Sequence, residues 1–537
     1  MKTKIAFILI LFLAVLIFVL PFQSPPSFNA DEAAFGYNAY SILKTGKDEY
    51  GNFLPARFKS FGDYKLPLYS YLSVPVIAVF GLTQSSVRLV AHLSGLLLII
   101  MVFFLTYELF KNKTVALIAM LLAAVSPWIH LLANHAHEAT LATLLIAFSV
   151  YFLLKFINTK DRLWSAWSLV FASLSLYAYH TAKVVFVALL LINLYLLFKA
   201  KKEKIKLLGK RTTSLVFIFF LILITMFVVQ EIQTPARRIQ NLLIVNHSDI
   251  SLKSNEAKLE SRFTPFQNHA FIIGKEVANR YLAYFSPEFL VIQGDENPRF
   301  GYENISLITY LEFIFLIAGV FLIVKQKRRK DQLFLLLLLI VPLASALSWQ
   351  TYSYTRVHPM IIFLLPIASY GFYSLLHKKR WLLFSGIFFT LALSFTSLYF
   401  YYFHYPKRDL VIRTWQAGYQ QLAQHIQKNY SQYDAFYITR KNGQPYIMLL
   451  YYLHYPPEKY QAQAKLSAPD EYGFGQVENF DKFHFNFQKP KSGQSALLIG
   501  YPDDFNDFNN LDPNKLQKII VGTEEMFWLY PIKQKSD

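Results

Sequence analysis

The chain contains no cysteine among its 537 residues. A disulfide, a thiolate nucleophile and a cysteine metal site are therefore excluded, and the redox compartment cannot be inferred. Charged residues are scarce at 16% of the chain, whereas soluble globular proteins contain about 25%. The sequence also lacks a P-loop, a GxSxG motif, an HExxH motif and a dinucleotide-binding fingerprint. The common signatures of nucleotide-binding and hydrolytic enzymes are thus absent.

Hydrophobic residues make up 54% of the chain and aromatic residues 17%. Apolar runs recur along it, each close to the roughly 20 residues that cross a bilayer as a helix. We predict eleven spans, at residues 5–22, 88–110, 114–132, 140–157, 163–179, 183–198, 212–230, 306–324, 333–348, 359–376 and 381–402. No small-x-small cleavage site precedes Gln23, so we interpret the first run as a retained helix rather than a signal peptide. The sequence predicts a polytopic α-helical membrane protein.

The formal net charge of +19 does not predict a nucleic-acid partner, because the lysines and arginines lie in short loops between the apolar runs. With the N-terminus in the cytoplasm, every strongly basic short loop falls on the cytoplasmic side. These loops are residues 111–113, 160–162, 199–211, 325–330 and 378–380. The pattern predicts a multi-pass protein of the plasma membrane with a cytoplasmic N-terminus.

A further apolar stretch, Pro67 to Gly81, is short and contains Pro75. If it crossed the membrane, the later basic loops would face outward. We therefore predict an interfacial or re-entrant helix on the outer side. The alternative is a true span, with Arg88 to Glu108 as the irregular element.

The predicted topology defines two domains. Residues 1–402 are predicted to form a transmembrane domain with a first external loop at 23–87 and a long external loop at 231–305. Residues 403–537 are polar and aromatic, with short alternating runs at 434–439, 496–499 and 519–521. This composition predicts a small extracytoplasmic α/β domain.

Two adjacent carboxylates, Asp31 and Glu32, follow the first apolar run. Carboxylates at the mouth of a hydrophobic segment are costly unless they are solvated or functional. A carboxylate beside an apolar wall has a tunable basicity, which suits a general base. The alternative is that Asp31 caps the next helix and Glu32 is solvated.

Lys65 closes the same external loop in the run Lys65-Leu66-Pro67-Leu68-Tyr69. A lysine at the start of an interfacial helix can reach a phosphate, and the helix dipole would assist it. The alternative is a lysine that extends to lipid headgroups.

Glu138 lies at the predicted outer end of the fourth span, and it is either a functional acid or an ordinary helix-start acid. The nearby His135 and His137 are two residues apart and would point to different faces of a helix, which does not favour a metal site. His180 and Lys183 form a second polar break between two apolar runs.

Two further basic residues fall on the outer face, which the positive-inside rule expects to be poor in them. Arg299 ends the run Asp295-Glu296-Asn297-Pro298-Arg299, and Arg356 precedes the tenth span. Their position indicates that at least one of them binds an anion. Arg237-Arg238 is the alternative for this role.

The external loop that opens with Asp31-Glu32 and closes with Lys65-x-Pro67-Leu68-Tyr69, together with about eleven spans, resembles the GT-C glycosyltransferases. More narrowly, the chain is similar to the family 39-like enzymes, which include protein O-mannosyltransferases and the aminoarabinose transferase of lipid A. Bacterial members with the run DEAAFGYNAYSILKTGKDEYG are the most similar. The resemblance covers roughly residues 1–400.

The resemblance implies an inverting glycosyltransferase that uses a polyprenyl-phosphate sugar donor at the external face. Asp31 would be the general base, and Glu138 the second acid, orienting the acceptor or a lysine. Lys65 and Arg356 would hold the donor phosphate. The other expected substrate-binding residues are Glu32, Tyr69, His180, Lys183, Asp295, Asn297 and Arg299. The acceptor would be a protein, a lipid or a glycan. No cofactor is predicted, although a divalent metal stays an open alternative.

Two departures from the family pattern stand out. Where the family usually has lysine-proline-proline, this chain has Lys65-Leu66-Pro67. Where the family often has serine-arginine before the second acid, this chain has Ala133-Asn134.

The alternative function is a transporter or flippase of lipid-linked sugars. Transporters place ionisable groups near the bilayer midplane, whereas the candidate residues gather at one predicted face. That distribution favours an enzyme.

Overall fold

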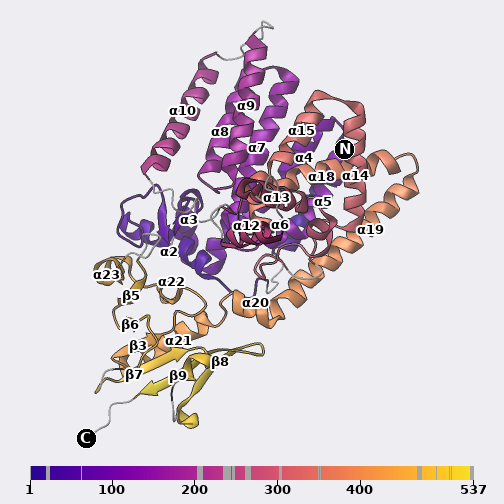
Figure 1. Ribbon diagram of the computed structural model, residues 1–537. Coiled ribbons are helices and arrows are strands. Elements are labelled where there is room, and N and C mark those ends of the chain that lie inside the picture. The colour runs from indigo at the N-terminus through magenta and orange to yellow at the C-terminus, as the bar shows by residue number, and fades with distance from the viewer. Residues whose placement is uncertain are drawn as a thin grey trace. The chain divides into compact units, whose positions relative to one another are not determined.

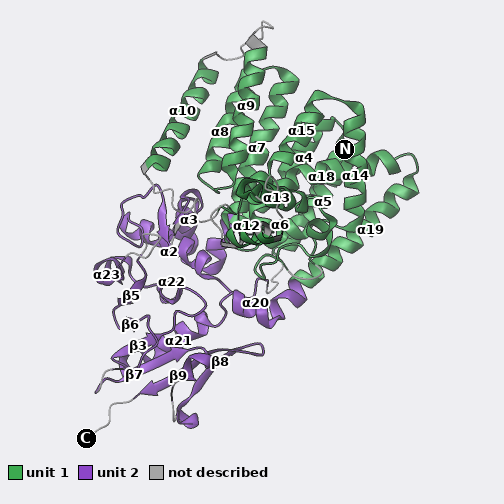
Figure 2. Ribbon diagram, in the orientation of Figure 1, with its two compact units in different colours: residues 1–21, 91–401 green, residues 22–90, 402–537 purple. Residues whose placement is uncertain are grey.

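The computed structural model describes residues 2–19, 24–61, 63–201, 210–233, 243–244, 248–260, 268–301, 305–348, 350, 352–468, 475–490, 493–506, 508 and 511–532. It forms two compact units, shown in Figure 2. Unit 1 comprises Met1–Pro21 and Ala91–Tyr401, and unit 2 comprises Phe22–Val90 and Tyr402–Asp537. The units divide the chain differently from the predicted domains, because residues 22–90 belong with the C-terminal region.

Unit 1 is built from helices (Figure 1). In the described part of the chain, seven are long and apolar enough to cross a membrane: Lys2–Val19 (α1), Gln84–Phe110 (α4), Glu138–Thr159 (α7), Ala182–Lys199 in α9 (Ala182–Lys201), Arg211–Ile232 in α10 (Lys210–Gln233), Tyr354–Leu376 and Arg380–Lys407. An eighth span is possible if α5 (Lys113–Ala124) and α6 (Pro127–Ala133), which are bent by 52°, cross as a pair. The chain is a multi-pass membrane protein.

The other predicted spans are helical but shorter: α8 (Arg162–Leu176), α14 (Tyr310–Gln326), and α15 (Arg329–Ile340) with α16 (Leu343–Ala346). Tyr354–Leu376 consists of α17 (Tyr354–Val357), η4 (His358–Met360) and α18 (Ile361–Leu376), and the last span begins with α19 (Arg380–Tyr399). The predicted long loop contains α12 (Ser248–Glu260), α13 (His269–Ala283) and η3 (Glu288–Ile292). Eleven apolar runs were predicted, and length alone supports seven or eight spans.

Close backbone contact holds α14 against α18. A Cβ atom on Gly319 would collide with the carbonyl oxygen of Ile367, and one on Gly371 with that of Phe315. Small residues allow such approach between helices in lipid. α7, α8 and α9 lie side by side (Figure 1). Hydrogen bonds join them; for example, Ser149 Oγ of α7 donates a 2.7 Å hydrogen bond to the Ser168 carbonyl oxygen of α8.

Unit 2 contains a seven-stranded sheet in the order β4-β5-β6-β3-β7-β9-β8. The strands are β3 (Ala435–Ile438), β4 (Lys465–Leu466), β5 (Val477–Phe480), β6 (Phe483–His484), β7 (Ala496–Gly500), β8 (Gln517–Val521) and β9 (Glu524–Ile532). β3 is parallel to both β6 and β7, and the other pairs are antiparallel. The three alternating runs predicted a sheet here, and β3, β7 and β8 confirm it.

The helices of this region are α20 (Asp409–Thr414), α21 (Tyr419–Asn429), α22 (Pro445–Tyr452) and α23 (Pro457–Gln463). Short turns complete it: η5 (Phe400–His404), η6 (Tyr405–Lys407), η7 (Tyr430–Gln432), η8 (Pro502–Phe505) and η9 (Pro513–Lys515). Buried Ala435, Leu498 and Phe505 form part of the core on one face of the sheet.

The predicted first external loop folds as α2 (Ala30–Thr45), the hairpin β1 (Phe58–Ser60) and β2 (Asp63–Lys65), and α3 (Leu68–Phe80). α2 packs against α3 and α22, and a Cβ atom on Gly36 would collide with Val87. α3 has 13 residues, including Pro75. It is about 20 Å long, less than the roughly 30 Å hydrocarbon core. Its interfacial placement stays a prediction.

Candidate functional site

The first turn of α2 places the two acids identified in the sequence. Asn29 caps this helix: its side chain accepts a 3.0 Å bond from the Glu32 amide, while the Glu32 carboxylate accepts a 3.2 Å bond from the Asn29 amide. This reciprocal pair is a capping box. The alternative in which Asp31 caps the helix and Glu32 is solvated is therefore wrong. Asp31 lies one residue inside the helix, and Glu32 is fully buried.

Glu32 forms a bidentate ion pair with Arg88 in α4. Arg88 Nε lies 2.8 Å from Glu32 Oε1, and Nη2 lies 2.9 Å from Oε2. Arg88 also donates a 2.6 Å bond to the Ser27 carbonyl. With both of its oxygens bonded inside the fold, Glu32 has the geometry of a structural residue. Sequence reasoning missed Arg88, although it is another basic residue at the predicted outer end of a span.

Asp31 instead pairs with Lys65, the last residue of β2. The distance from Lys65 Nζ to Asp31 Oδ1 is 2.8 Å, and the same ammonium lies 3.3 Å from the Asp31 carbonyl oxygen. The Asp31 side chain is 47% exposed, whereas that of Lys65 is 12% exposed. The ring of Phe35 lies 4.3 Å below the ammonium. The structure thus joins an accessible carboxylate to a cation held against an aromatic wall.

A third acid, Glu49, is buried near this pair and was not singled out from the sequence. Neither of its carboxylate oxygens has a hydrogen-bond partner among the described residues. Burial and the neighbouring Asp48 carboxylate together raise its pKa to about 8, and the Lys65 ammonium opposes the shift. The tyrosines within electrostatic reach of this carboxylate are Tyr37, Tyr50, Tyr446 and Tyr460.

Two other residues of unit 2, Gln416 and Tyr69, form hydrogen bonds that hold the first turn of α2 and the start of α3 in place. Gln416 accepts a 2.8 Å bond from the Ala30 amide and donates another to the Asn442 carbonyl. No sequence signal points to it. Tyr69, a predicted substrate-binding residue, is fully buried and donates a 2.8 Å bond to the Val87 carbonyl. That geometry suits an anchor for α3.

In unit 1, Glu138 is the first residue of α7, where a carboxylate complements the helix dipole. His137 caps the helix by accepting a 3.0 Å bond from the Ala139 amide. The rings of His135 and His137 are 5.5 Å apart, and Phe300 packs against both. Among the described residues, no group of three or more His, Asp or Glu side chains could hold a metal ion.

Asp295 lies in the loop after η3 and is 4% exposed. It accepts bonds from two backbone amides, 2.6 Å from Tyr354 and 2.9 Å from Asn297. Burial raises its pKa to about 7, although these bonds and the nearby Arg356 guanidinium oppose the shift. Asn297 in turn accepts a 3.0 Å bond from the Arg299 amide. The predicted motif is thus a locally bonded turn with a buried acid.

Arg356, in α17, donates to the Ser348 hydroxyl. The Tyr179 hydroxyl lies within electrostatic reach of Arg356, Glu138 and Asp295, and it donates a 3.2 Å bond to Thr355. Unit 1 therefore gathers two acids and an arginine around one tyrosine, although they are far apart in sequence.

The remaining candidates lie elsewhere in unit 1. Lys183 forms a 2.9 Å ion pair with Glu231 of α10, and His180 lies in the turn before α9. Arg237-Arg238, the alternative anion-binding pair, lies outside the described residues. The candidates thus form two groups: Asp31 with Lys65 in unit 2, and Glu138, Asp295 and Arg356 in unit 1.

The chain is similar to known proteins both in sequence and in fold. The model of the dolichyl-phosphate-mannose-protein mannosyltransferase family matches residues 65–229. ArnT from Cupriavidus metallidurans in the apo state matches with a TM-score of 0.60 and 13% identity, over 99% of this chain and 98% of that one. ArnT bound to undecaprenyl phosphate matches with a TM-score of 0.57 and 12% identity, over 98% and 97%. No curated protein matches in a sequence search.

The chain therefore has the fold of the GT-C glycosyltransferases, which the ArnT match shows over nearly the whole of both chains. The family match, over residues 65–229, supports a relationship to the dolichyl-phosphate-mannose-protein mannosyltransferases. The resemblance predicted from the sequence is confirmed at this level.

Proposed function

We propose that this protein transfers a sugar from a polyprenyl-phosphate donor to an extracytoplasmic protein, lipid or glycan, with inversion at the anomeric carbon. The observation that carries the proposal is the Asp31–Lys65 ion pair. It combines an accessible carboxylate in the first turn of α2 with a largely buried cation at the end of β2. The ArnT structure with undecaprenyl phosphate supports a polyprenyl phosphate as the carrier.

The proposed reaction is a single displacement. The Asp31 carboxylate takes the proton of an acceptor hydroxyl while that oxygen attacks the anomeric carbon. The bond from this carbon to the phosphate oxygen breaks, and its electron pair leaves on the polyprenyl phosphate. One displacement at one carbon gives a product of inverted configuration.

Cations offset the charge that develops on the leaving phosphate. In this proposal Lys65 is released toward the phosphate when the donor binds, which frees the Asp31 carboxylate to act as a base. Arg356 keeps its predicted role as a second cation for the donor phosphate. Its ordinary partner, the Ser348 hydroxyl, is neutral, so a phosphate would compete well for it.

Glu138 is proposed to orient the acceptor, and Asp295 to hold the loop that precedes Arg356. Glu32 and Tyr69 support the site through the fold of unit 2, because both side chains are fully buried. The C-terminal sheet is proposed to lie outside the membrane, on the same side as Asp31.

The test uses cells that lack the gene. Mass spectrometry of their glycoproteins, lipids and surface glycans should show the loss of one sugar, which identifies donor and acceptor together. The wild-type gene and Glu525→Gln should restore that sugar, whereas Asp31→Asn should not. Glu525 is a matched control because its ion pair with Lys518 is also 2.8 Å long. Restoration by Asp31→Asn would exclude Asp31 as the base.

The stereochemistry is tested separately with the purified full chain. Nuclear magnetic resonance should show that the product has the anomeric configuration opposite to that of the donor. A product that retains the donor configuration would contradict a single displacement.

A further inference from the structure

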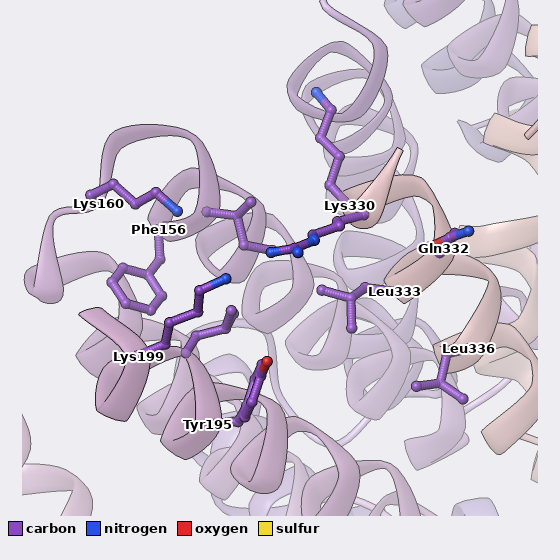
Figure 3. Close-up of a pocket in the computed structure, with 11 residues that line it drawn as sticks. Phe156, Lys160, Tyr195, Lys199, Lys330, Gln332, Leu333 and Leu336 are labelled. Carbon is purple, nitrogen blue, oxygen red and sulfur yellow. The ribbon is translucent and has the colours of Figure 1, made fainter. Parts of the chain in front are cut away.

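Unit 1 contains a pocket at the end of α7 opposite to Glu138. It has a volume of about 320 Å³ and lies between the ends of α7 and α9 and the beginning of α15 (Figure 3). Lys160 follows the 22 residues of α7, so this pocket is about 33 Å along the helix from Glu138. None of the residues assigned to sugar transfer lines it. It lies on the face that the positive-inside pattern assigns to the cytoplasm.

Four cations line the pocket, and no acid does: Lys160, Lys199, Arg329 and Lys330. Figure 3 shows the amino groups of Lys160, which follows α7, and Lys199, in α9, directed toward the same space. Within the residues that the structure describes, none of the four takes part in a salt bridge. Asp331, the nearest carboxylate in sequence, is buried and does not line the pocket.

The N-terminus of α15 also favours the binding of an anion in this pocket. Arg329, Lys330 and the buried Asp331 occupy the first turn of α15, and no side chain caps that helix. Cations at a helix N-terminus oppose the helix dipole, whereas an anion there is stabilised. The basic residues and the uncapped amides thus favour the same kind of ligand.

The apolar part of the lining distinguishes a lipid from a soluble anion. Phe156, Leu196, Leu333 and Leu336 form the walls. Leu336 is 45% exposed, and Leu339 continues the same face of α15. The volume is at the low end of the roughly 300–1,000 Å³ of small-molecule sites. It fits a headgroup, and the acyl chains would lie outside along the exposed apolar sides of α9 and α15.

We propose that this pocket binds the headgroup of an anionic phospholipid, with its phosphate between Lys160, Lys199 and Arg329. A basic pocket between membrane helices is the arrangement that recognises such lipids. The site is separate from the residues proposed for sugar transfer, so it stands whether or not that proposal holds.

The experiment uses the purified full chain and native mass spectrometry. After exchange into phosphatidylglycerol-containing micelles, wild-type protein should retain bound phosphatidylglycerol and not phosphatidylcholine. Lys160→Gln/Lys199→Gln/Arg329→Gln should weaken this binding about tenfold or more, since each cation near a membrane surface contributes to anionic lipid binding. Lys378→Gln/Lys379→Gln/Arg380→Gln is the matched control, with three cations removed from another loop of the same predicted face, and it should bind normally.

A charge-preserving variant, Lys160→Arg/Lys199→Arg, is the control for misfolding caused by substitution at these positions, and it should retain the lipid. Equal retention by the triple glutamine variant and wild type would overturn the proposal. Inorganic phosphate is the second probe: if it displaces the lipid at equal concentration, the site is one for a free phosphate and the lipid assignment is wrong. Equal binding of phosphatidylcholine would also overturn it.

Discussion

The first turn of α2 has an exposed side at Asp31 and a buried side at Glu32, and the two adjacent carboxylates have different partners. Asp31 pairs with Lys65 and keeps nearly half its surface accessible, whereas Glu32 is enclosed by Arg88 and its own capping box. Adjacent residues in a helix point about 100° apart, which explains how one turn serves both sides. Accessibility, rather than charge, separates the proposed base from the structural acid.

The largest expected effect is on catalysis at the exposed side. Asp31→Asn should lower the transfer rate about 10²- to 10⁴-fold, the usual contribution of a positioned general base. Donor affinity should stay within a few-fold of wild type. Transfer kinetics with a saturating donor would measure this, and a rate near the wild-type value would remove the contrast between the two acids.

The second effect is on stability at the buried side. Glu32→Gln should lower the free energy of unfolding by about 3–5 kcal/mol, because it leaves Arg88 without its ion partner. Thermal unfolding in detergent would measure the loss. The double variant Glu32→Leu/Arg88→Met should recover part of it, since no buried charge remains. If Glu32→Gln were as stable as wild type, the pair would have no structural role.

The third effect concerns Glu49, a buried acid that, unlike Glu32, has no arginine partner. Its folded pKa of about 8 exceeds the ordinary 4.5, so the folded state favours the protonated form. The free-energy cost of burying the ionised Glu49 carboxylate is absent below pH 4.5. It grows as the pH rises to 8 and is fully present above pH 8. Glu49→Gln should therefore stabilise the protein at pH 8 on the order of a few kcal/mol, and not at pH 4.5. Unfolding midpoints at the two pH values would test this; an equal gain at both would refute it.

The smallest effect is on donor binding. Lys65→Ala and Arg356→Ala should each weaken donor affinity roughly ten- to hundredfold, the contribution of one hydrogen bond to a charged group. Binding of a labelled polyprenyl-phosphate sugar to purified variants would measure the change. Lys518→Ala, on the exposed Lys518–Glu525 pair, is the control and should bind like wild type. Unchanged affinity in both test variants would exclude them as phosphate ligands.

Much of the helical part of the fold could be predicted from the apolar runs, because each of them contains a helix in the described residues. The number of spans could not, since α8, α14 and α15 contain only 15, 17 and 12 residues. Asp31 and Lys65 were both singled out by their charge, and the structure pairs them, while their roles stay predictions. The Asn29-x-x-Glu32 capping box was also visible as a pattern and was overlooked in favour of Asp31.

The pairing of side chains could not be predicted. Lys65 reaches Asp31 only through the hairpin of β1 and β2, which has no strong sequence signal. Gln416 lies 386 positions from Ala30, and such a contact depends on the tertiary fold. The grouping of residues 22–90 with the C-terminal region likewise depends on contacts of the tertiary fold between segments far apart in sequence.

One measurement compares the two acids directly. The single-turnover transfer rate per folded molecule is measured for Asp31→Asn and Glu32→Gln, together with their unfolding midpoints. We expect Asp31→Asn to lose transfer at a nearly normal midpoint, and Glu32→Gln to keep transfer at a lowered midpoint. Loss of transfer in folded Glu32→Gln, with a normal rate in Asp31→Asn, would contradict the assignment of Asp31 as the base.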